Sequence, residues 1–241
     1  MADTIWIGDQ ANKLYRQSGQ FSSTIRDSEG VGGAPKGCSW DDTNTPYNLI
    51  DTDKLYLRSG QFTATIKDSV YVGGVDNVPS DVSWDGTDTP WSGNQADKLY
   101  KQSAQFTTTL KTSVSVTSID SLPTGIESDQ NNDLYWCGYN DDKVYKQSGY
   151  SSTVKTSMSI FAQETLVTGI GFNGADPLVT GEQMDKLLLM SGTFTVTVKS
   201  SVNVGSVDAL PQGSTHGDAS ARLPSDTIVP KVVHLMRMMG V

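Results

Sequence analysis

Three aromatic side chains occupy one recurring position beside polar turns, and they are the residues best suited to bind a ligand. They are Tyr47, Trp91 and Trp136. Flat rings can pack on sugar faces, and nearby amides can hydrogen-bond to sugar hydroxyls. Asn94 lies near Trp91, and Asn140 lies near Trp136. These five residues predict repeated glycan sites, and the alternative is that the rings belong to the core.

No arrangement of nucleophile, base and acid predicts an active site. The two histidines, His216 and His234, lie near the C-terminal end and far from the recurring acids. Asp41, Asp85 and Asp129 recur at one spacing, but Asp is favoured in turns because its side chain bonds to nearby backbone. A cation bound by these acids is the alternative. We predict a non-catalytic protein with no cofactor and no metal site.

Composition excludes several partners. The chain has 241 residues, 18 basic and 27 acidic, with a net charge of −9. It has no basic cluster to neutralise phosphates, so we expect no nucleic-acid binding. No apolar stretch approaches the roughly 20 residues of a membrane-spanning helix. Cys38 and Cys137 occupy different positions in their repeats, which predicts two free thiols.

The first ten residues, MADTIWIGDQ, contain neither a basic segment nor an apolar one. We therefore predict no signal peptide and expect synthesis in the cytoplasm. Release by a leaderless route, or within a virion, is compatible with this expectation.

A repeat of 44 residues organises the chain. It spaces the equivalent residues Trp40, Trp84, Ser128, Phe172 and His216. One period contains four short alternating segments separated by turn residues, for example VSWD, PWSG, KLYKQS and FTTTLKTSVSV. Four strands per unit at this period are typical of a β-propeller.

The ends of the repeat predict how the ring closes. The N-terminal segment enters the repeat at its second strand, and residues 211–218 supply the missing first strand. We therefore predict an all-β, five-bladed β-propeller over residues 1–218, with 44-residue four-stranded blades. A C-terminal strand would pair with the N-terminal blade and remove the open sheet edges.

The pattern P-x-G-V-S-W-D-G followed by DKLY-x-x-S-G resembles the blades of NHL-like propellers. The five-fold count and the small polar blades resemble the tachylectin-2 type of five-bladed lectin. The near-identical middle copies resemble the duplicated propellers of bacteria and their phages. These resemblances imply a binding scaffold.

Other recurring residues are predicted to be structural, because every blade faces equivalent neighbours. Trp40, Trp84 and Phe172 should wedge between blades. The remaining sets are interior residues, turn acids and turn glycines: Leu14, Leu55, Leu99, Val144 and Leu187; the Asp-Lys steps at 53–54, 97–98, 142–143 and 185–186; and Gly19, Gly60, Gly149 and Gly192, with Ala104 in one copy.

Residues 219–241 depart from the repeat and form a C-terminal extension. Val232, Leu235, Met236 and Met239 would share one face of a short helix. That face would cap the propeller itself or dock on another subunit of a larger assembly.

Two functions remain open. The first is a structural or interaction module, for example a phage virion or tail component. The alternative is a carbohydrate-binding, lectin-like propeller with repeated sites.

Overall fold

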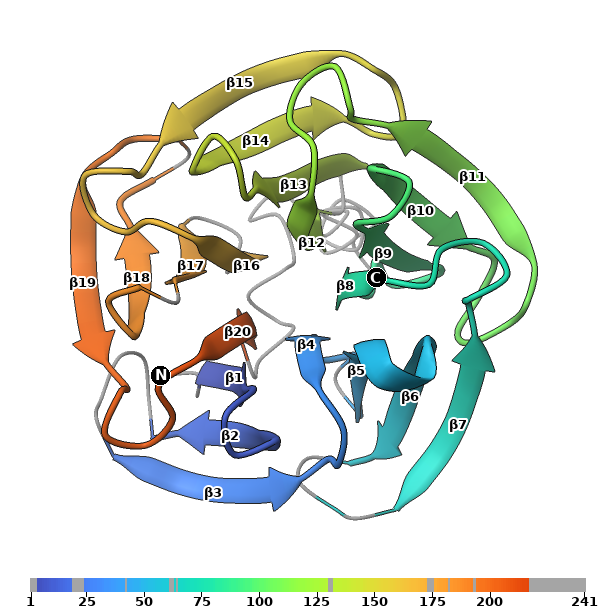
Figure 1. Cartoon of the computed structure of the whole chain (residues 1–241), viewed down its shortest axis with the longest axis horizontal. Helices are drawn as coiled ribbons and strands as arrows, with labels where there is room; N and C mark the ends of the chain where they lie inside the picture. Colours follow the sequence, from blue (N-terminus) through green and yellow to red (C-terminus); the bar gives the residue numbers. More distant parts are fainter. Residues whose placement is uncertain are drawn as a thin grey trace, which may run out of the picture.

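The computed structural model describes residues 4–18, 24–41, 43–60, 63, 65–129, 132–172, 176–181, 183–192 and 194–216. This part of the chain forms five four-stranded antiparallel sheets arranged as blades around a central axis (Figure 1). The predicted all-β, five-bladed propeller is therefore confirmed.

The strands of each blade are given from the axis outward. Blade 1 contains β20 (Pro211–His216), β1 (Thr4–Gly8), β2 (Lys13–Gln17) and β3 (Ile25–Gly30). Blade 2 contains β4 (Pro35–Cys38), β5 (Asn44–Leu49), β6 (Lys54–Ser59) and β7 (Ile66–Tyr71), with the 3-10 helix η1 (Ile50–Thr52) between β5 and β6. Blade 3 contains β8 (Pro79–Val82), β9 (Thr89–Gly93), β10 (Lys98–Gln102) and β11 (Leu110–Ser115).

The last two blades follow the same order. Blade 4 contains β12 (Pro123–Ser128), β13 (Asp133–Gly138), β14 (Lys143–Ser148) and β15 (Val154–Ser159). Blade 5 contains β16 (Val167–Phe172), β17 (Pro177–Gly181), β18 (Lys186–Met190) and β19 (Val198–Asn203).

Blade 1 closes the ring as predicted. β20 pairs with β1 in antiparallel register, with Thr4 opposite His216 and Trp6 opposite Ser214. The inner strands begin earlier than the sequence pattern indicated, at a proline in four of the five blades. Proline tolerates the first position of a strand because its missing N–H is not needed there. Trp40 and Trp84 consequently follow the inner strands β4 and β8 rather than lying within them.

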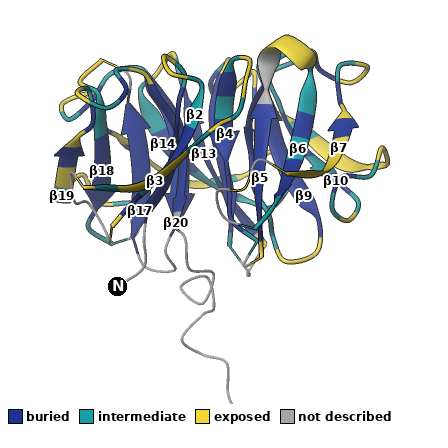
Figure 2. Ribbon diagram, turned by 90° about the horizontal axis from the view of Figure 1, so that it is seen from below, coloured by how far each residue is buried: buried dark blue, intermediate teal, exposed yellow. Residues whose placement is uncertain are grey.

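The hydrophobic core consists of five clusters, each shared by two neighbouring blades. Trp40 and Phe172 belong to such clusters, as predicted. The predicted interior residues are also buried in them: Leu14, Leu55, Leu99, Val144 and Leu187. Figure 2 shows this burial along the strands, with exposed residues in the loops and outer strands.

Acidic side chains hold the turns on one face of the ring. Asp208 accepts hydrogen bonds from the backbone N–H groups of Gln10 (3.1 Å) and Ala11 (2.9 Å). Asp76 bonds in the same way to Gln95 and Ala96. This role was not predicted, although the acids recur three residues before the inner-strand prolines.

The predicted turn role of the glycines is confirmed where the structure describes them. The acids of two Asp-Lys steps accept backbone N–H groups as predicted, but from the loop before the next inner strand and not from their own turn. Asp97 accepts the N–H of Leu122 at 2.9 Å, and Asp142 accepts that of Leu166 at 2.8 Å. Gly60, Gly149 and Gly192 have positive φ angles, as does Ala104 in the copy without glycine. Gly19 lies outside the described residues.

Candidate functional site at the mouth of the central channel

The three aromatic residues predicted to bind a ligand are core residues. Trp91 and Trp136 are 0% exposed and Tyr47 is 1% exposed. Each stacks on a tyrosine of the next strand, and the Trp91 and Tyr100 ring centroids are 4.2 Å apart. Their ring faces are therefore not available to a sugar in this structure. Glycan binding remains a prediction, and these three positions offer no exposed aromatic ring to support it.

The two predicted asparagines have different environments. The Asn140 amide is exposed and donates to Ser121 Oγ at 2.6 Å and to its carbonyl oxygen at 3.1 Å, so it holds a loop. Asn94 instead lines a cavity at the centre of the ring. Its Oδ1 is buried and has no hydrogen-bond partner among the described residues.

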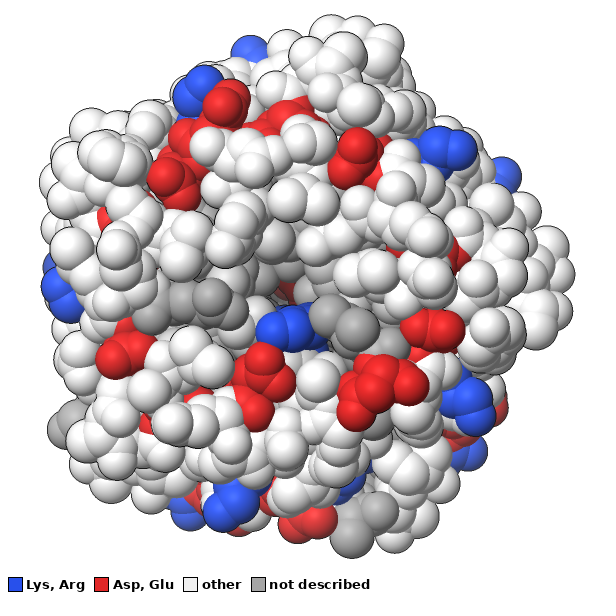
Figure 3. All heavy atoms as spheres, viewed as in Figure 1, with Lys and Arg blue, Asp and Glu red and all other residues white. Residues whose placement is uncertain are grey.

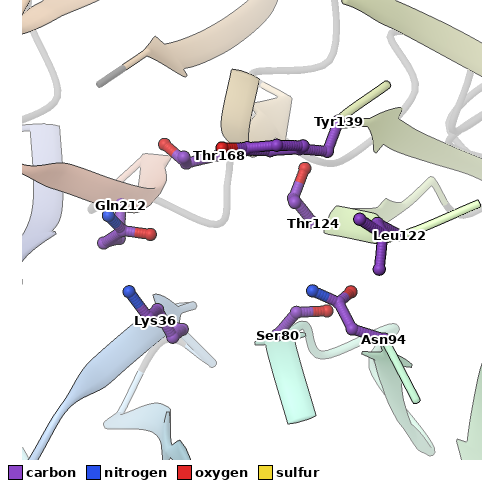
Figure 4. A pocket seen from close by; sticks show the side chains of 8 residues that line it. All are labelled: Lys36, Ser80, Asn94, Leu122, Thr124, Tyr139, Thr168 and Gln212. Carbon is purple, nitrogen blue, oxygen red and sulfur yellow. The ribbon is translucent and has the colours of Figure 1, made fainter. Parts of the chain in front are cut away.

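This cavity lies at the mouth of the central channel and has a volume of about 240 Å³. It opens on the face that carries η1, which faces the viewer in Figure 1. Figure 3 shows a central hollow on that face, containing basic side-chain atoms with acidic ones around it. The lining residues come from all five blades and are shown in Figure 4: Lys36, Ser80, Asn94, Leu122, Thr124, Tyr139, Thr168 and Gln212.

Five lining residues occupy one repeat position, immediately after the first residue of each inner strand. They are Lys36, Ser80, Thr124, Thr168 and Gln212. Their 44-residue spacing was visible in the sequence one residue after the recurring prolines. They were not predicted as a site, because these five polar side chains form no recognisable motif until the ring brings them together.

Three of these side chains join neighbouring blades. The hydroxyls of Ser80, Thr124 and Thr168 donate to the first carbonyl of the next inner strand at 2.5, 2.7 and 2.9 Å. In blade 2 the equivalent bond, to Pro79 O at 2.6 Å, comes from Asn48 on β5. Blade 2 therefore contacts blade 3 through Asn48, and Lys36 is not needed for the bond that Ser80, Thr124 and Thr168 make in their own blades.

Lys36 is the one charged residue among the described residues that line the cavity. Its Nζ lies 2.6 Å from Asp9 Oδ2, and both side chains are partly exposed. Asp9 is the only partner of this ammonium group among the described residues. Two of the three ammonium N–H groups thus remain for another acceptor.

Leu122 lines the cavity in a strained conformation. Its φ is 61°, in the left-handed region that is unfavourable for a residue with a side chain. The hydrogen bond from its N–H to Asp97 holds it there. Its side chain is 37% exposed at the mouth. The equivalent residue of blade 5, Leu166, has a φ of 58° and the same bond to Asp142, so this conformation recurs with the repeat.

Below the cavity, inner-strand glycines bring the backbones close to the axis. A Cβ on Gly169 would lie 2.5 Å from Gly213 Cα, and one on Gly213 would lie 2.6 Å from Gly37 Cα. Asp81 occupies the equivalent position in blade 3, and its carboxyl group reaches Gly37 and Gly213. This side chain therefore lies across the channel.

Asp81 is buried, and its carboxyl group accepts the N–H groups of Val82 (2.8 Å) and Ile126 (2.9 Å). Burial raises the pKa of Asp81 well above its usual value, and the nearby Glu127 carboxyl raises this pKa further, against those two hydrogen bonds. Burial also raises the pKa of the Cys38 and Cys137 thiols, which are both free, as predicted.

The remaining acids do not form a second site. Asp41 and Asp85 each accept two backbone N–H groups of their own turns, so they open turns as expected. On the opposite face, a hollow of about 280 Å³ contains Asp88, which pairs with Lys101 and Lys111. Within the described ranges, no three His, Cys, Asp or Glu side chains form a metal-ligand set, and no helix has the length and hydropathy of a membrane span.

The fold defines the class of protein, a five-bladed β-propeller with a cavity at the mouth of its central channel. No family model matches the chain, and no curated protein matches it. Among solved structures, the chain is similar to one from a nidogen/laminin complex, with 12% identity, a TM-score of 0.61, and coverage of 91% of this chain and 99% of that chain.

Two enzymes share the fold at similar distance. Glutaminyl cyclase from Myxococcus xanthus has 9% identity and a TM-score of 0.59, with 85% of this chain and 75% of that chain covered. Virginiamycin B lyase from Staphylococcus aureus has 15% identity and a TM-score of 0.52, with 87% and 72% covered. The same fold thus serves enzymes and a protein found in a complex, so function must be argued from the site.

The predicted C-terminal extension, 219–241, lies outside the described residues, and so do its four docking candidates: Val232, Leu235, Met236 and Met239. The assembly role attached to it stays a prediction.

Proposed function

We propose that this protein is a non-catalytic interaction module that binds its partner at the mouth of the central channel. One observation supports this most directly. Polar groups with unused hydrogen-bonding capacity, from Lys36, Asn94 and Tyr139, line one cavity on three different blades: Lys36 pairs with Asp9 alone, and Asn94 Oδ1 and the Tyr139 hydroxyl have no partner among the described residues. Unsatisfied polar groups in a concavity are suited to a ligand that satisfies them.

The cavity lining also favours binding over catalysis. Among its described lining residues it combines one cation with hydroxyl and amide groups, and it has no Asp, Glu, His or Cys side chain that could activate a hydroxyl as a nucleophile. The hydroxyls of Ser80, Thr124 and Thr168 already donate to backbone carbonyls. The nearest buried carboxyl group along the inner strands, that of Asp81, is already held by two backbone N–H groups.

The solved nidogen/laminin complex supports a partner-binding role by analogy of fold alone. A glycan remains a possible ligand class for the predicted lectin-like alternative, but it would bind at Asn94 and Tyr139 rather than at the buried Trp91 and Trp136. The finer assignment to a phage virion or tail has no support in the described residues.

A screen of small polar molecules by ligand-observed NMR tests the proposal. We expect binders whose signals respond to the wild-type protein and lose that response with Tyr139→Ala and with Asn94→Ala. Tyr71→Ala is the matched control, because Tyr71 is 58% exposed on the outermost strand of blade 2. If Tyr139→Ala and Tyr71→Ala retain the same binders, the channel mouth is not the binding site.

A further inference from the structure

We propose that the channel mouth is a carboxylate-binding site in which Lys36 is the anchoring cation. This inference rests on the proposed binding function and adds the chemical class of the ligand. The carboxylate belongs either to a small free acid or to an acidic side chain of a partner protein.

The first support is the departure from five-fold symmetry at one repeat position. Ser80, Thr124 and Thr168 hold the next blade with a hydroxyl group, whereas Lys36 makes no such bond. Asn48 supplies the missing contact to Pro79. The Lys36 side chain in blade 2 therefore does not link the inner strands of neighbouring blades. Its Nζ points into the cavity, as Figure 4 shows.

The second support is the set of available donors. Lys36 retains two N–H groups after its bond to Asp9. The Tyr139 hydroxyl has no partner among the described residues. The buried Asn94 Oδ1 also lacks one, but it is an acceptor and suits the hydroxyl group of a hydroxy acid, not the carboxylate itself. A carboxylate can accept from the ammonium and phenol groups at once, and charge-assisted bonds of this kind are among the strong ones.

The third support is the charge of the described lining residues. None of the described residues that line the cavity is acidic. Asp81 lies in the channel below it, and burial raises the pKa of this carboxyl group, which favours its uncharged form. The competing negative charge is Asp9, which contacts Lys36 from the blade 1 turn.

Size narrows the ligand further. The cavity, at about 240 Å³, is smaller than the roughly 300–1,000 Å³ of pockets for drug-sized ligands. It therefore suits a molecule of a few non-hydrogen atoms or a single side chain. Leu122 and the Tyr139 ring provide apolar surface for the carbon atoms of such a group.

NMR titrations with two matched pairs of probes test the inference in a buffer without carboxylates. One pair is lactate and lactamide. The other is a blocked Gly-Asp-Gly tripeptide and its Gly-Asn-Gly counterpart. We expect the acids to bind with a Kd on the order of millimolar and their amides at least roughly tenfold more weakly. Preference for lactate indicates a free acid, and preference for the Asp peptide indicates a partner's side chain.

Two substitutions change Lys36 in opposite senses. Lys36→Gln should weaken acid binding roughly tenfold or more. Asp9→Asn should strengthen it several-fold, because the ammonium loses its internal competitor. Lys98→Gln, at the start of β10 and outside the cavity lining, is the control and should leave the Kd unchanged. Circular dichroism establishes that each variant is folded.

The outcomes separate the two proposals. If the amides bind at the mouth as well as the acids do, or if Lys36→Gln and Asp9→Asn leave the acids' Kd unchanged, the carboxylate inference is wrong and the binding site stands. If none of the four probes and no molecule of the broader screen binds, both proposals are overturned.

Discussion

At the scale of single residues, Asp81 is the side chain that most distinguishes the channel from a symmetric ring. Four inner strands have glycine at this position, and blade 3 has a buried carboxyl group instead. Its partners are backbone N–H groups, while Glu127 and the Cys38 thiol lie close enough to interact electrostatically with it. Burying a carboxyl group without a cation favours its protonated form.

This arrangement predicts a pH dependence of stability. An unfolded aspartate has a pKa near 3.9. Because the folded-state pKa of Asp81 is raised, the folded chain keeps a proton that the unfolded chain loses. The free energy of unfolding should therefore fall as pH rises from about 4 to the folded-state pKa, by about 1.4 kcal/mol for each unit of elevation.

Asp81→Gly and Asp81→Asn remove this titration. Urea unfolding measured at several pH values should show a shallower decline in stability for both variants than for the wild type. Asp81→Gly introduces the residue found at this position in the other four blades, so we expect the inner strand to keep its backbone conformation. An unchanged slope in both variants would show that Asp81 ionises normally in the folded protein.

At the scale of elements, the inner strands depend on close backbone packing around the axis. Gly169 lies in β16, where an added Cβ would be 2.9 Å from the carbonyl oxygen of Gln212 and 2.5 Å from Gly213 Cα. Backbone atoms cannot move aside as flexible side chains can. Substituting this glycine should therefore disturb the contact between blade 5 and blade 1.

We predict that Gly169→Ala lowers the free energy of unfolding by about 1–3 kcal/mol or more. Gly30→Ala is the matched control, because Gly30 is also in a strand, β3, and has open space around it. That change should stay within about 0.5 kcal/mol of the wild type. Chemical denaturation measures both, and equal effects would refute a tightly packed inner ring.

Most of the fold could be predicted, because the 44-residue repeat determines the number and order of strands in each blade. Period, strand number, turn glycines and ring closure all follow from spacing in one chain. The site was not predictable in the same way. Trp91 looked like a ligand platform, but β10 places Tyr100 on its ring, and that contact depends on the register between β9 and β10. A binding role for Lys36 could not be predicted from the sequence, because the five equivalent residues of the repeat come together only around the axis of the folded ring.

At the scale of the whole molecule, β20 closes the ring by pairing with β1 of the first blade. A chain ending at residue 210 would lack it and would expose the edge of β1 to pairing with other chains. We predict that this truncation abolishes cooperative thermal unfolding and promotes aggregation, whereas a chain ending at residue 218 remains folded.

Thermal melts followed by circular dichroism, together with size-exclusion chromatography, compare the two truncations. The second also tests the predicted domain boundary at residue 218. Cooperative, monomeric behaviour of the shorter chain would show that four complete blades and an incomplete one are sufficient.

The pairing of β1 with β20 has a mechanical consequence. Thr4 and His216 are opposite each other at one end of an antiparallel pair. A force applied between these two residues would load the hydrogen bonds of the pair one after another, so that it peels open like a zipper instead of shearing all at once. The pair should therefore open at a lower force when it is pulled through Thr4 and His216 than it would if the same two strands were loaded in shear.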